Sequence, residues 1–206
     1  MRALLGVFCA LYGSHLYASN VEVDFLGKLD TIEEHVSDPE KRLKAKYTII
    51  EMMSKCEFDE QCMLNMKSEL QQLAQEQKNI MYSAFVKYLD WEKNDLEYNI
   101  QHCQIDDKKE VRKVYAKCYQ QWVDVEKNHP PQNRGEIDKI ENDRNLCLLE
   151  NMTPLAQKGN IFAQADLVNL GEHFKDAQLM SKWEAKVNEQ KGSAKYQQYM
   201  KCSEIP

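Results

Sequence analysis

The sequence predicts an all-α protein, a disulfide-stabilised bundle of roughly six to eight helices, from the spacing of its apolar residues. Its 206 residues include only 7 glycines and 5 prolines, fewer than sheets joined by many tight turns need. Residues 40–129 contain neither and are rich in Glu, Lys, Gln, Leu, Met and Ala, which favour helix. Apolar side chains recur every three or four residues, as they do on one face of an α-helix.

The first elements follow from this spacing and from their start signals. Apolar residues predict one helix over residues 25–36 and another over residues 40–56, with Ser37 or Asp38 as the cap and Pro39 in the first turn. Asp59 is expected to cap a third helix, and the helical periodicity then continues to Cys103. We expect a break or kink near residues 75–79, because ordinary globular helices have about 8–20 residues.

The second half of the chain reads as several further helices. Asp106 and Asp107 are expected to cap a helix that extends to about residue 127, and residues 128–135 form a clear loop. Apolar residues from Ile137 to Cys147 mark the next helix, and Thr153-Pro154 is expected to open another. Shorter helical pieces are expected after this point, divided by Gly159, Gly171 and Gly192.

Residues 1–18 have the pattern of a secretory signal peptide. Met1-Arg2 is a positive start, residues 3–11 are apolar, and Ala18 is a small residue before a polar one. A short membrane anchor is the alternative, but this apolar run is too short to span the ~30 Å of a bilayer core. We therefore predict a secreted protein with one helical domain over residues 19–206.

The cysteines support this interpretation. The chain has 7 cysteines, and Cys9 lies within the predicted signal peptide. An even number then remains, which in an oxidising compartment indicates three disulfides. Their pairing stays open: Cys56 and Cys62 suit a local bridge or two bridges to one neighbour, and Cys202 is expected to pin the C-terminal segment. The six cysteines are Cys56, Cys62, Cys103, Cys118, Cys147 and Cys202.

No motif names a reaction. The chain lacks the glycine-rich and nucleophile motifs of common phosphate-binding enzymes and serine hydrolases. Its histidines are isolated in sequence, and Cys103 beside His102 cannot ligate a metal as a thiolate if it is in a disulfide. Acidic pairs such as Asp106-Asp107 are interpreted as charges that oppose a helix dipole. We predict a non-enzyme with no catalytic residue, no metal and no cofactor.

Two candidate surface sites remain. One is a basic stripe at helical spacing, read either as a contact for an anionic partner such as a sulfated glycan or, preferably, as a solvated helix face. The formal net charge of −6 argues against nucleic acid as a partner. The other is Asn151, a candidate glycosylation acceptor in an expected loop, whose use Pro154 disfavours. The basic stripe consists of Lys108, Lys109, Arg112, Lys113 and Lys117.

A set of aromatic residues has two interpretations. The rings either pack in the core with their hydroxyls toward the surface, which we favour, or line a cavity for a small apolar ligand. The set is Tyr82, Tyr88, Trp91, Tyr98, Tyr115, Tyr119 and Trp122.

Residues 1–19 (MRALLGVFCALYGSHLYAS), with the KYTIIEMMSKC and KYQQYMKC segments, carry a resemblance to a known group of proteins. The chain resembles the secreted all-helical salivary proteins of blood-feeding mosquitoes, which include a neutrophil-stimulating factor and a labrum-interacting salivary protein. Insect odorant-binding proteins are also helical with three disulfides, but the spacings Cys56/Cys62 and Cys147/Cys202 depart from their pattern. No binding residues are carried over from that family.

The resemblance implies a secreted, non-enzymatic salivary effector that binds a protein and stimulates host leukocytes at the bite site. Two alternatives remain open, which are binding to a cuticular protein of the mouthparts and carriage of a small hydrophobic ligand. The expected partner is a host cell-surface or cuticular protein. We expect no nucleic acid, no membrane span and a monomer.

Overall fold

The computed structural model describes residues 28–29, 31–32, 36–129, 131 and 134–203. Throughout this part of the chain the regular secondary structure is helical, without strands, which confirms the predicted all-α class. The predicted signal peptide with Cys9, and most of the helix predicted over residues 25–36, lie outside the described residues. No helix within the described ranges is both long and apolar enough to cross a bilayer.

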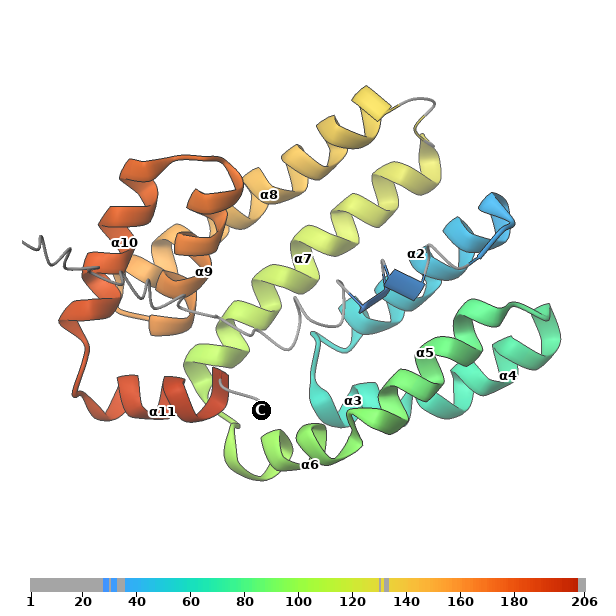
Figure 1. The fold of residues 1–206 in the computed structure, drawn as a ribbon, viewed down its shortest axis with the longest axis horizontal. Coiled ribbons are helices and arrows are strands. Elements are labelled where there is room, and N and C mark those ends of the chain that lie inside the picture. Colours follow the sequence, from blue (N-terminus) through green and yellow to red (C-terminus); the bar gives the residue numbers. More distant parts are fainter. Residues whose placement is uncertain (1–27, 30, 33–35, 130, 132–133, 204–206) are drawn as a thin grey trace, which may run out of the picture.

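Two long helices form the centre of the molecule. α7 (Asp106–Asn128) and α8 (Arg134–Gln157) run antiparallel and pack side by side, and α2 (Pro39–Lys55) lies on the other side of α7 (Figure 1). The remaining helices pack at the two flanks. They are α3 (Glu60–Asn65), α4 (Lys67–Gln77), α5 (Ile80–Trp91), α6 (Lys93–His102), α9 (Ile161–His173), α10 (Ala177–Glu189) and α11 (Ala194–Ser203).

Two of the predicted helix starts are confirmed. The Asp38 carboxylate accepts hydrogen bonds from the backbone N–H groups of Glu40 and Lys41, both at 3.2 Å, and Asp59 accepts from Cys62 N at 3.1 Å. These bonds satisfy amides that have no partner inside the helix. The prediction for Asp106 and Asp107 is wrong, since the cap position is Ile105, without a side-chain bond, and both aspartates lie in the first turn of α7.

The expected break near residues 75–79 is confirmed. Lys78 ends α4 in the left-handed region (φ 47°), and Asn79 caps α5 by accepting from Met81 N at 3.1 Å. The Asn79 amide also donates to the Lys41 carbonyl oxygen of α2 at 2.8 Å. The polar run at residues 75–79 therefore forms the turn between α4 and α5, and Asn79 in this turn connects the two helices to α2.

The helix start predicted at Thr153-Pro154 is wrong, because α8 continues through Pro154 to Gln157. A proline removes one hydrogen bond of a helix interior, and here it stands only three residues before the helix ends. The actual turn follows at Gly159, whose φ of +89° suits glycine. Asn160 then caps α9 by accepting from Ala163 N at 3.1 Å.

Gly171, expected to divide two helices, lies inside α9. A Cβ there would lie 2.9 Å from the backbone nitrogen of Met180, so its lack of a side chain lets α9 and α10 approach closely.

The core runs through the whole described part of the chain. Most of the aromatic set is buried, as the favoured interpretation requires, and only Trp91 and Tyr98 of that set are exposed. The Tyr82 hydroxyl is buried as well, so the expectation that the hydroxyls reach the surface is wrong for this residue. Tyr47, Phe58, Tyr119 and Trp122 form edge-to-face pairs between α2, the α2–α3 turn and α7, with ring centroids 5.6–6.3 Å apart. Such pairs stabilise a core beyond the area that they bury.

Candidate functional site

The six cysteines form three pairs. Cys56–Cys62 closes the turn between α2 and α3, Cys118–Cys147 joins α7 to α8, and Cys103–Cys202 joins residues 99 positions apart. The local bridge is therefore the correct alternative for Cys56 and Cys62. Cys202 does hold the C-terminal helix, as expected.

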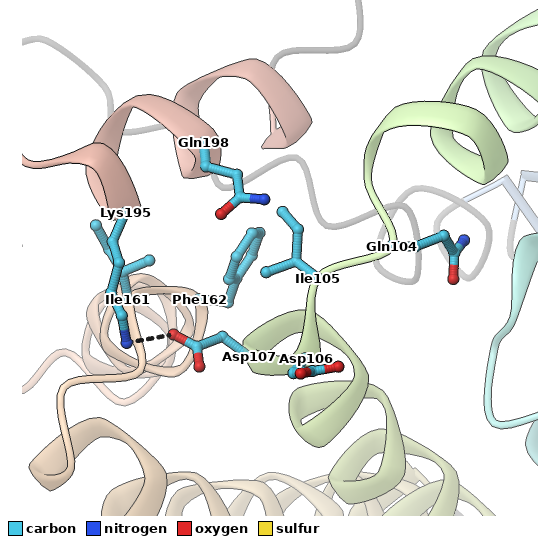
Figure 2. A pocket seen from close by; sticks show the side chains of 8 residues that line it. All are labelled: Gln104, Ile105, Asp106, Asp107, Ile161, Phe162, Lys195 and Gln198. Carbon is cyan, nitrogen blue, oxygen red and sulfur yellow. Dashed lines mark hydrogen bonds and ion pairs between the residues drawn. The ribbon is translucent and has the colours of Figure 1, made fainter.

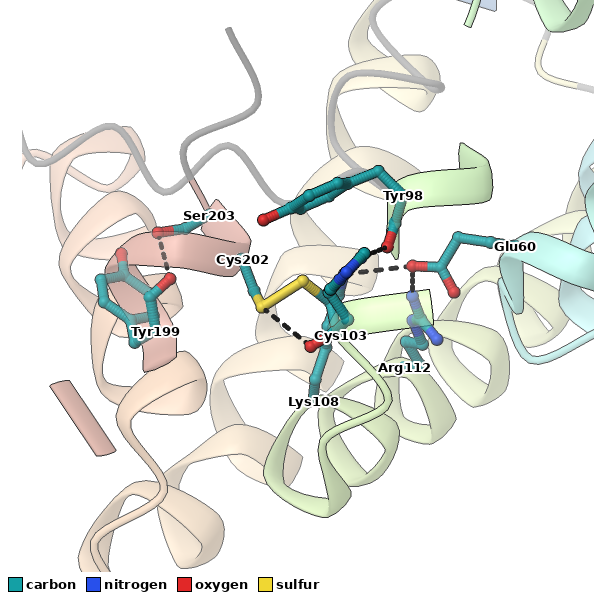
Figure 3. Close-up of a disulfide and its surroundings, with 9 residues drawn as sticks. Glu60, Tyr98, Cys103, Lys108, Arg112, Tyr199, Cys202 and Ser203 are labelled. Carbon is teal, nitrogen blue, oxygen red and sulfur yellow. Dashed lines mark hydrogen bonds and ion pairs between the residues drawn. A yellow bond between two sulfur atoms is a disulfide. The ribbon is translucent and has the colours of Figure 1, made fainter. Parts of the chain in front are cut away.

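The Cys103–Cys202 disulfide is the meeting point of three helices. Cys103 directly follows α6, α7 begins three residues later, and Cys202 lies in α11 (Figure 3). Both cysteines are buried. A pocket lies among α7, α9 and α11. The exposed rings of Trp91, Tyr98 and His102 lie on α5 and α6, up to the residue before Cys103.

The pocket has a mixed lining of apolar and polar side chains. Its volume is about 310 Å³, at the lower end of the range of ~300–1,000 Å³ that small-molecule sites occupy. Its apolar lining residues are Ile105, Ile161 and Phe162, of which Ile161 and Phe162 are nearly fully buried. The Phe162 ring packs edge-on against Tyr199, with centroids 5.2 Å apart. The full lining is Gln104, Ile105, Asp106, Asp107, Ile161, Phe162, Lys195 and Gln198 (Figure 2).

The rim of the pocket is charged. Lys195 Nζ on α11 lies 3.2 Å from Asp107 Oδ2 on α7. Asp106, whose side chain is almost fully exposed, lies beside it in the same helical turn. The Asn160 amide donates to the Asp107 carbonyl oxygen at 2.7 Å, which ties the start of α9 to the start of α7. The charged lining residues carry two negative charges against one positive charge.

A second feature, which we call the aromatic stripe, consists of Tyr88, Trp91, Tyr98 and His102. Tyr88 and Trp91 are three residues apart on α5, and Tyr98 and His102 are four residues apart on α6, so each pair shares one face of its own helix. Trp91 is 74% exposed and Tyr98 is 41% exposed. The Tyr98 ring stacks on His102 at 4.4 Å, and Tyr88 lies 6.4 Å from Trp91. The sequence predicted Tyr88, Trp91 and Tyr98 in the core, which is correct for Tyr88 and wrong for Trp91 and Tyr98.

Lysines accompany the aromatic stripe at both ends. Lys28 Nζ lies 5.7 Å from the Trp91 ring centroid and 5.8 Å from that of Tyr88. Lys201 Nζ on α11 lies 5.8 Å from the Tyr98 ring. These distances permit cation–π attraction, so the face presents rings and positive charge together.

The predicted basic stripe is not a continuous surface. Lys108 is 3% exposed and Arg112 is 2% exposed, because both reach Glu60 of α3. Lys108 Nζ lies 3.1 Å from Glu60 Oε1, and Arg112 forms a close ion pair with the same oxygen (Figure 3). Lys108 and Arg112 are therefore not accessible to a glycan.

The other three basic residues are exposed but separately engaged or isolated. Lys109 lies 4.0 Å from Asp106, and Lys117 Nζ donates to Asn151 Oδ1 at 2.8 Å. Lys113 lies on the same exposed face of α7. The favoured interpretation, a solvated helix face, therefore describes Lys109, Lys113 and Lys117 but is wrong for the buried Lys108 and Arg112.

Asn151 does not lie in the expected loop. It is in the body of α8, where its amide nitrogen donates to the Cys147 carbonyl oxygen at 2.8 Å. The expectation failed because Pro154 was taken as a helix start. The acceptor nitrogen is therefore already engaged within a helix.

A smaller pocket of about 180 Å³ lies between α7 and α8, next to the Cys118–Cys147 disulfide. Trp122 lines it, and the Arg144 guanidinium lies 5.2 Å from the Trp122 ring and 5.0 Å from that of Tyr119. Trp122 is the one member of the aromatic set that lines either of these two pockets. Neither is the aromatic cavity that the carrier hypothesis required.

The histidines of the described residues lie on separate elements. His102 Nδ1 is 3.0 Å from the Tyr98 carbonyl oxygen in α6, and His173 Nε2 is 2.8 Å from Asn145 Nδ2 between α9 and α8. Within the described part of the chain, no three His, Cys, Asp or Glu side chains are placed to hold a metal ion together.

Comparison with models of protein families, with curated proteins and with solved structures finds no match for this chain.

Proposed function

We propose that this is a secreted, non-enzymatic effector that binds a protein partner through the aromatic stripe and modulates the host leukocyte response at the bite site. The observation that carries the proposal is the exposure of Trp91 on α5 and of Tyr98 on the next helix, α6, with Lys28 beside the first ring and Lys201 beside the second. The predicted signal peptide, the three disulfides and the resemblance to mosquito salivary proteins support the extracellular and salivary parts.

The stripe has the composition of an interaction surface. Trp and Tyr are among the residues that contribute most to protein–protein binding energy, because their large rings lose few rotatable bonds when they are buried. An exposed Trp also leaves a large apolar area in water, which a partner would remove. Trp91 ends α5 and Tyr98 lies in α6, and only Glu92 separates the two helices, so we expect one partner surface to cover both rings.

The charges define the partner more closely. Lys28 lies against the Trp91 ring and Lys201 lies against the Tyr98 ring. A partner with an acidic rim around an apolar pocket would meet these lysines and cover the rings. Such complementarity mainly raises association rate and specificity. We assign this chemistry to a host cell-surface protein, with an acidic cuticular protein of the mouthparts as the alternative partner for the same face.

The test compares two variants, each of which removes exposed apolar side chains. Trp91→Ala with Tyr98→Ala removes the rings of the stripe, whereas Ile80→Ala removes an exposed apolar residue, 65% exposed, from the other end of α5. Purified protein is added to neutrophils and cytokine expression is measured. We expect wild type and Ile80→Ala to induce cytokines and the double variant to lose at least about tenfold in potency, as loss of interface anchors does.

Failure has two distinct forms. No cytokine response to the wild-type protein rejects the leukocyte role, and retention on mouthpart extracts in a pull-down then supports the cuticular partner. An equal response to wild type and to the double variant rejects the stripe as the binding surface. A melting temperature for each variant excludes unfolding as the cause of a loss.

A further inference from the structure

We propose that the pocket between α7 and α8 binds a small carboxylate with an apolar body of one ring or a short chain, held by Arg144. The inference goes beyond the proposed function, because this pocket lies on α7 and α8 whereas the aromatic stripe lies on α5 and α6. It also replaces the aromatic cavity of the carrier hypothesis with a smaller site that the structure contains.

The lining of this pocket offers an apolar seat. Val125 of α7 is 47% exposed, and Ile140 and Cys147 of α8 are half-buried, so these side chains present surface that a ligand can cover. Trp122 and Cys118 add buried apolar atoms behind them, and the accessible lining is mostly apolar. Covering this surface with an apolar body is the main driving force for binding.

The volume of the pocket limits the body of the ligand. It is about 180 Å³, whereas drug-sized molecules occupy sites of ~300 Å³ or more. An apolar cavity of ~150 Å³ holds one benzene molecule. The pocket therefore suits a single ring or a chain of a few carbons and excludes a lipid.

Arg144 selects the head of the ligand. Its guanidinium lies 5.0 Å from the Tyr119 ring and 5.2 Å from the Trp122 ring, and its Nε and Nη2 both lie 3.3 Å from Asn145 Oδ1. Among the described residues no carboxylate pairs with it. Ring contacts use the face of a guanidinium and hydrogen bonds use its edge, so N–H groups remain for a carboxylate, which can accept two of them.

The other charged residue of the lining is already neutralised. Asp143 lines the pocket, but its Oδ2 lies 2.7 Å from Lys139 Nζ one turn earlier in α8. Arg144 is therefore the lining charge without a counter-charge among the described residues. An anionic head complements it, whereas a cationic head would be repelled.

The walls of the pocket are held in position before a ligand arrives. The Cys118–Cys147 disulfide joins α7 to α8 beside the pocket. The Trp122 indole N–H donates to Glu126 Oε1 at 2.7 Å, which fixes the plane of this ring. Binding to a pre-formed pocket loses little conformational entropy.

The first experiment measures binding of four probes by calorimetry. Benzoate, benzamide and benzylamine share one ring and differ in the charge of the head, and acetate has the carboxylate without the ring. We expect benzoate to bind, benzamide and acetate to bind at least about tenfold more weakly, and benzylamine not to bind. No binding of benzoate at millimolar concentration, or binding of benzamide or acetate equal to that of benzoate, overturns the proposal.

The second experiment removes the charge of Arg144. Arg144→Met keeps a long apolar side chain beside the rings, so it should weaken benzoate binding about tenfold and abolish the difference between benzoate and benzamide. Lys113→Met is the matched control, because Lys113 is an exposed basic residue of α7 that does not line the pocket. It should leave both affinities unchanged, and a difference between the two probes that persists in Arg144→Met overturns the proposal.

A third variant has the opposite expected sign. Asp143→Asn removes a negative charge from the lining, so it should bind benzoate at least as tightly as the wild type. Simple damage to the pocket would weaken binding in both variants, so weaker binding by Asp143→Asn also overturns the proposal. If Arg144→Met does not fold, Asp143→Asn and the four probes still decide.

The Trp91→Ala, Tyr98→Ala variant should bind benzoate normally, because neither ring lines the pocket. This result separates failure of the inference from failure of the proposed function.

Discussion

Helix α7 forms ion pairs at both of its ends, and the two ends differ in burial. Near its start, Lys108 and Arg112 meet Glu60 of α3, and all three side chains are at most 3% exposed. Near its end, Lys127 pairs with Glu51 of α2, with side chains that are 42% and 27% exposed. The same residue types therefore occupy a dry environment at one end of the helix and a wet environment at the other.

This difference shows that burial, rather than charge alone, decides how much each ion pair contributes to stability. A charge taken out of water must find a partner, and losing that partner leaves a costly isolated ion. An exposed pair exchanges protein contacts for water contacts and contributes little. The buried end of α7 is also the end at which the larger pocket and the Cys103–Cys202 disulfide lie.

The largest expected effect comes from breaking the buried end. Glu60→Gln leaves Lys108 and Arg112 without their shared carboxylate, while Asp59, 3.9 Å from Arg112, remains. We expect a loss of about 3–5 kcal/mol in the free energy of unfolding, as for other broken buried pairs. Chemical denaturation at pH 7 measures it.

Glu51→Gln is the matched change at the exposed end and should cost less than about 1 kcal/mol. If Glu60→Gln and Glu51→Gln lowered the free energy of unfolding equally, burial would not explain the difference between the two ends of α7.

The disulfides come next. Cys103→Ser with Cys202→Ser removes the bridge across 99 positions, whereas Cys118→Ser with Cys147→Ser removes one across 29. Each should cost about 2–4 kcal/mol, and the longer loop more, because its bridge restricts the unfolded chain more. Thermal melting of both double variants checks the order, and a larger loss for the shorter loop would show that native contacts dominate instead.

A smaller effect is expected at the exposed end itself. Lys127→Met removes the interhelical partner of Glu51 but leaves Lys55, 2.9 Å from the same carboxylate. The free energy of unfolding should fall by less than about 1 kcal/mol, and less still at high salt, since salt screens exposed charges. Denaturation at low and at high salt tests this, and a loss that salt does not reduce would place the pair in a drier environment than its exposure indicates.

The smallest effect is a pH dependence. Hydrogen bonds from Lys127 and then Lys55 lower the pKa of Glu51 below its ordinary value of 4.5. A lowered pKa adds stability that is present above pH 4.5 and is lost as the pH falls through the lowered value. The difference in melting temperature between wild type and Glu51→Gln should therefore close in acid, and a difference that persists at pH 2 would contradict this assignment.

Local features of the fold were predictable from the sequence. Asp38 and Asp59 are caps because a carboxylate reaches the amides of the next turn whatever surrounds the helix. The turn at Lys78 and Asn79 was predictable because a polar run there interrupts the regular spacing of apolar residues in the sequence. The continuation of α8 through Pro154 was not predictable in this way. In the sequence, a proline near the end of a helix cannot be distinguished from a proline near the start of one.

The candidate sites were predictable only in part. The aromatic set contained Trp91 and Tyr98, but periodicity alone does not distinguish a ring that faces the core from one that faces water. The basic residues of α7 were recognised, while the burial of Lys108 and Arg112 was not. No pattern indicated the pocket, because Asp107, Phe162 and Lys195 are far apart in the sequence.

The sequence by itself determined the helical class, the caps, the corner near residue 78 and the presence of six cysteines able to pair, since all of these depend on composition or on neighbours within a few residues. The tertiary structure alone decided which cysteines pair, which charges are dry and which rings remain exposed. Burial arises where one helix meets another, and Glu60 meets Lys108 across 48 positions of the chain. The physical environment of a side chain is set by those distant partners.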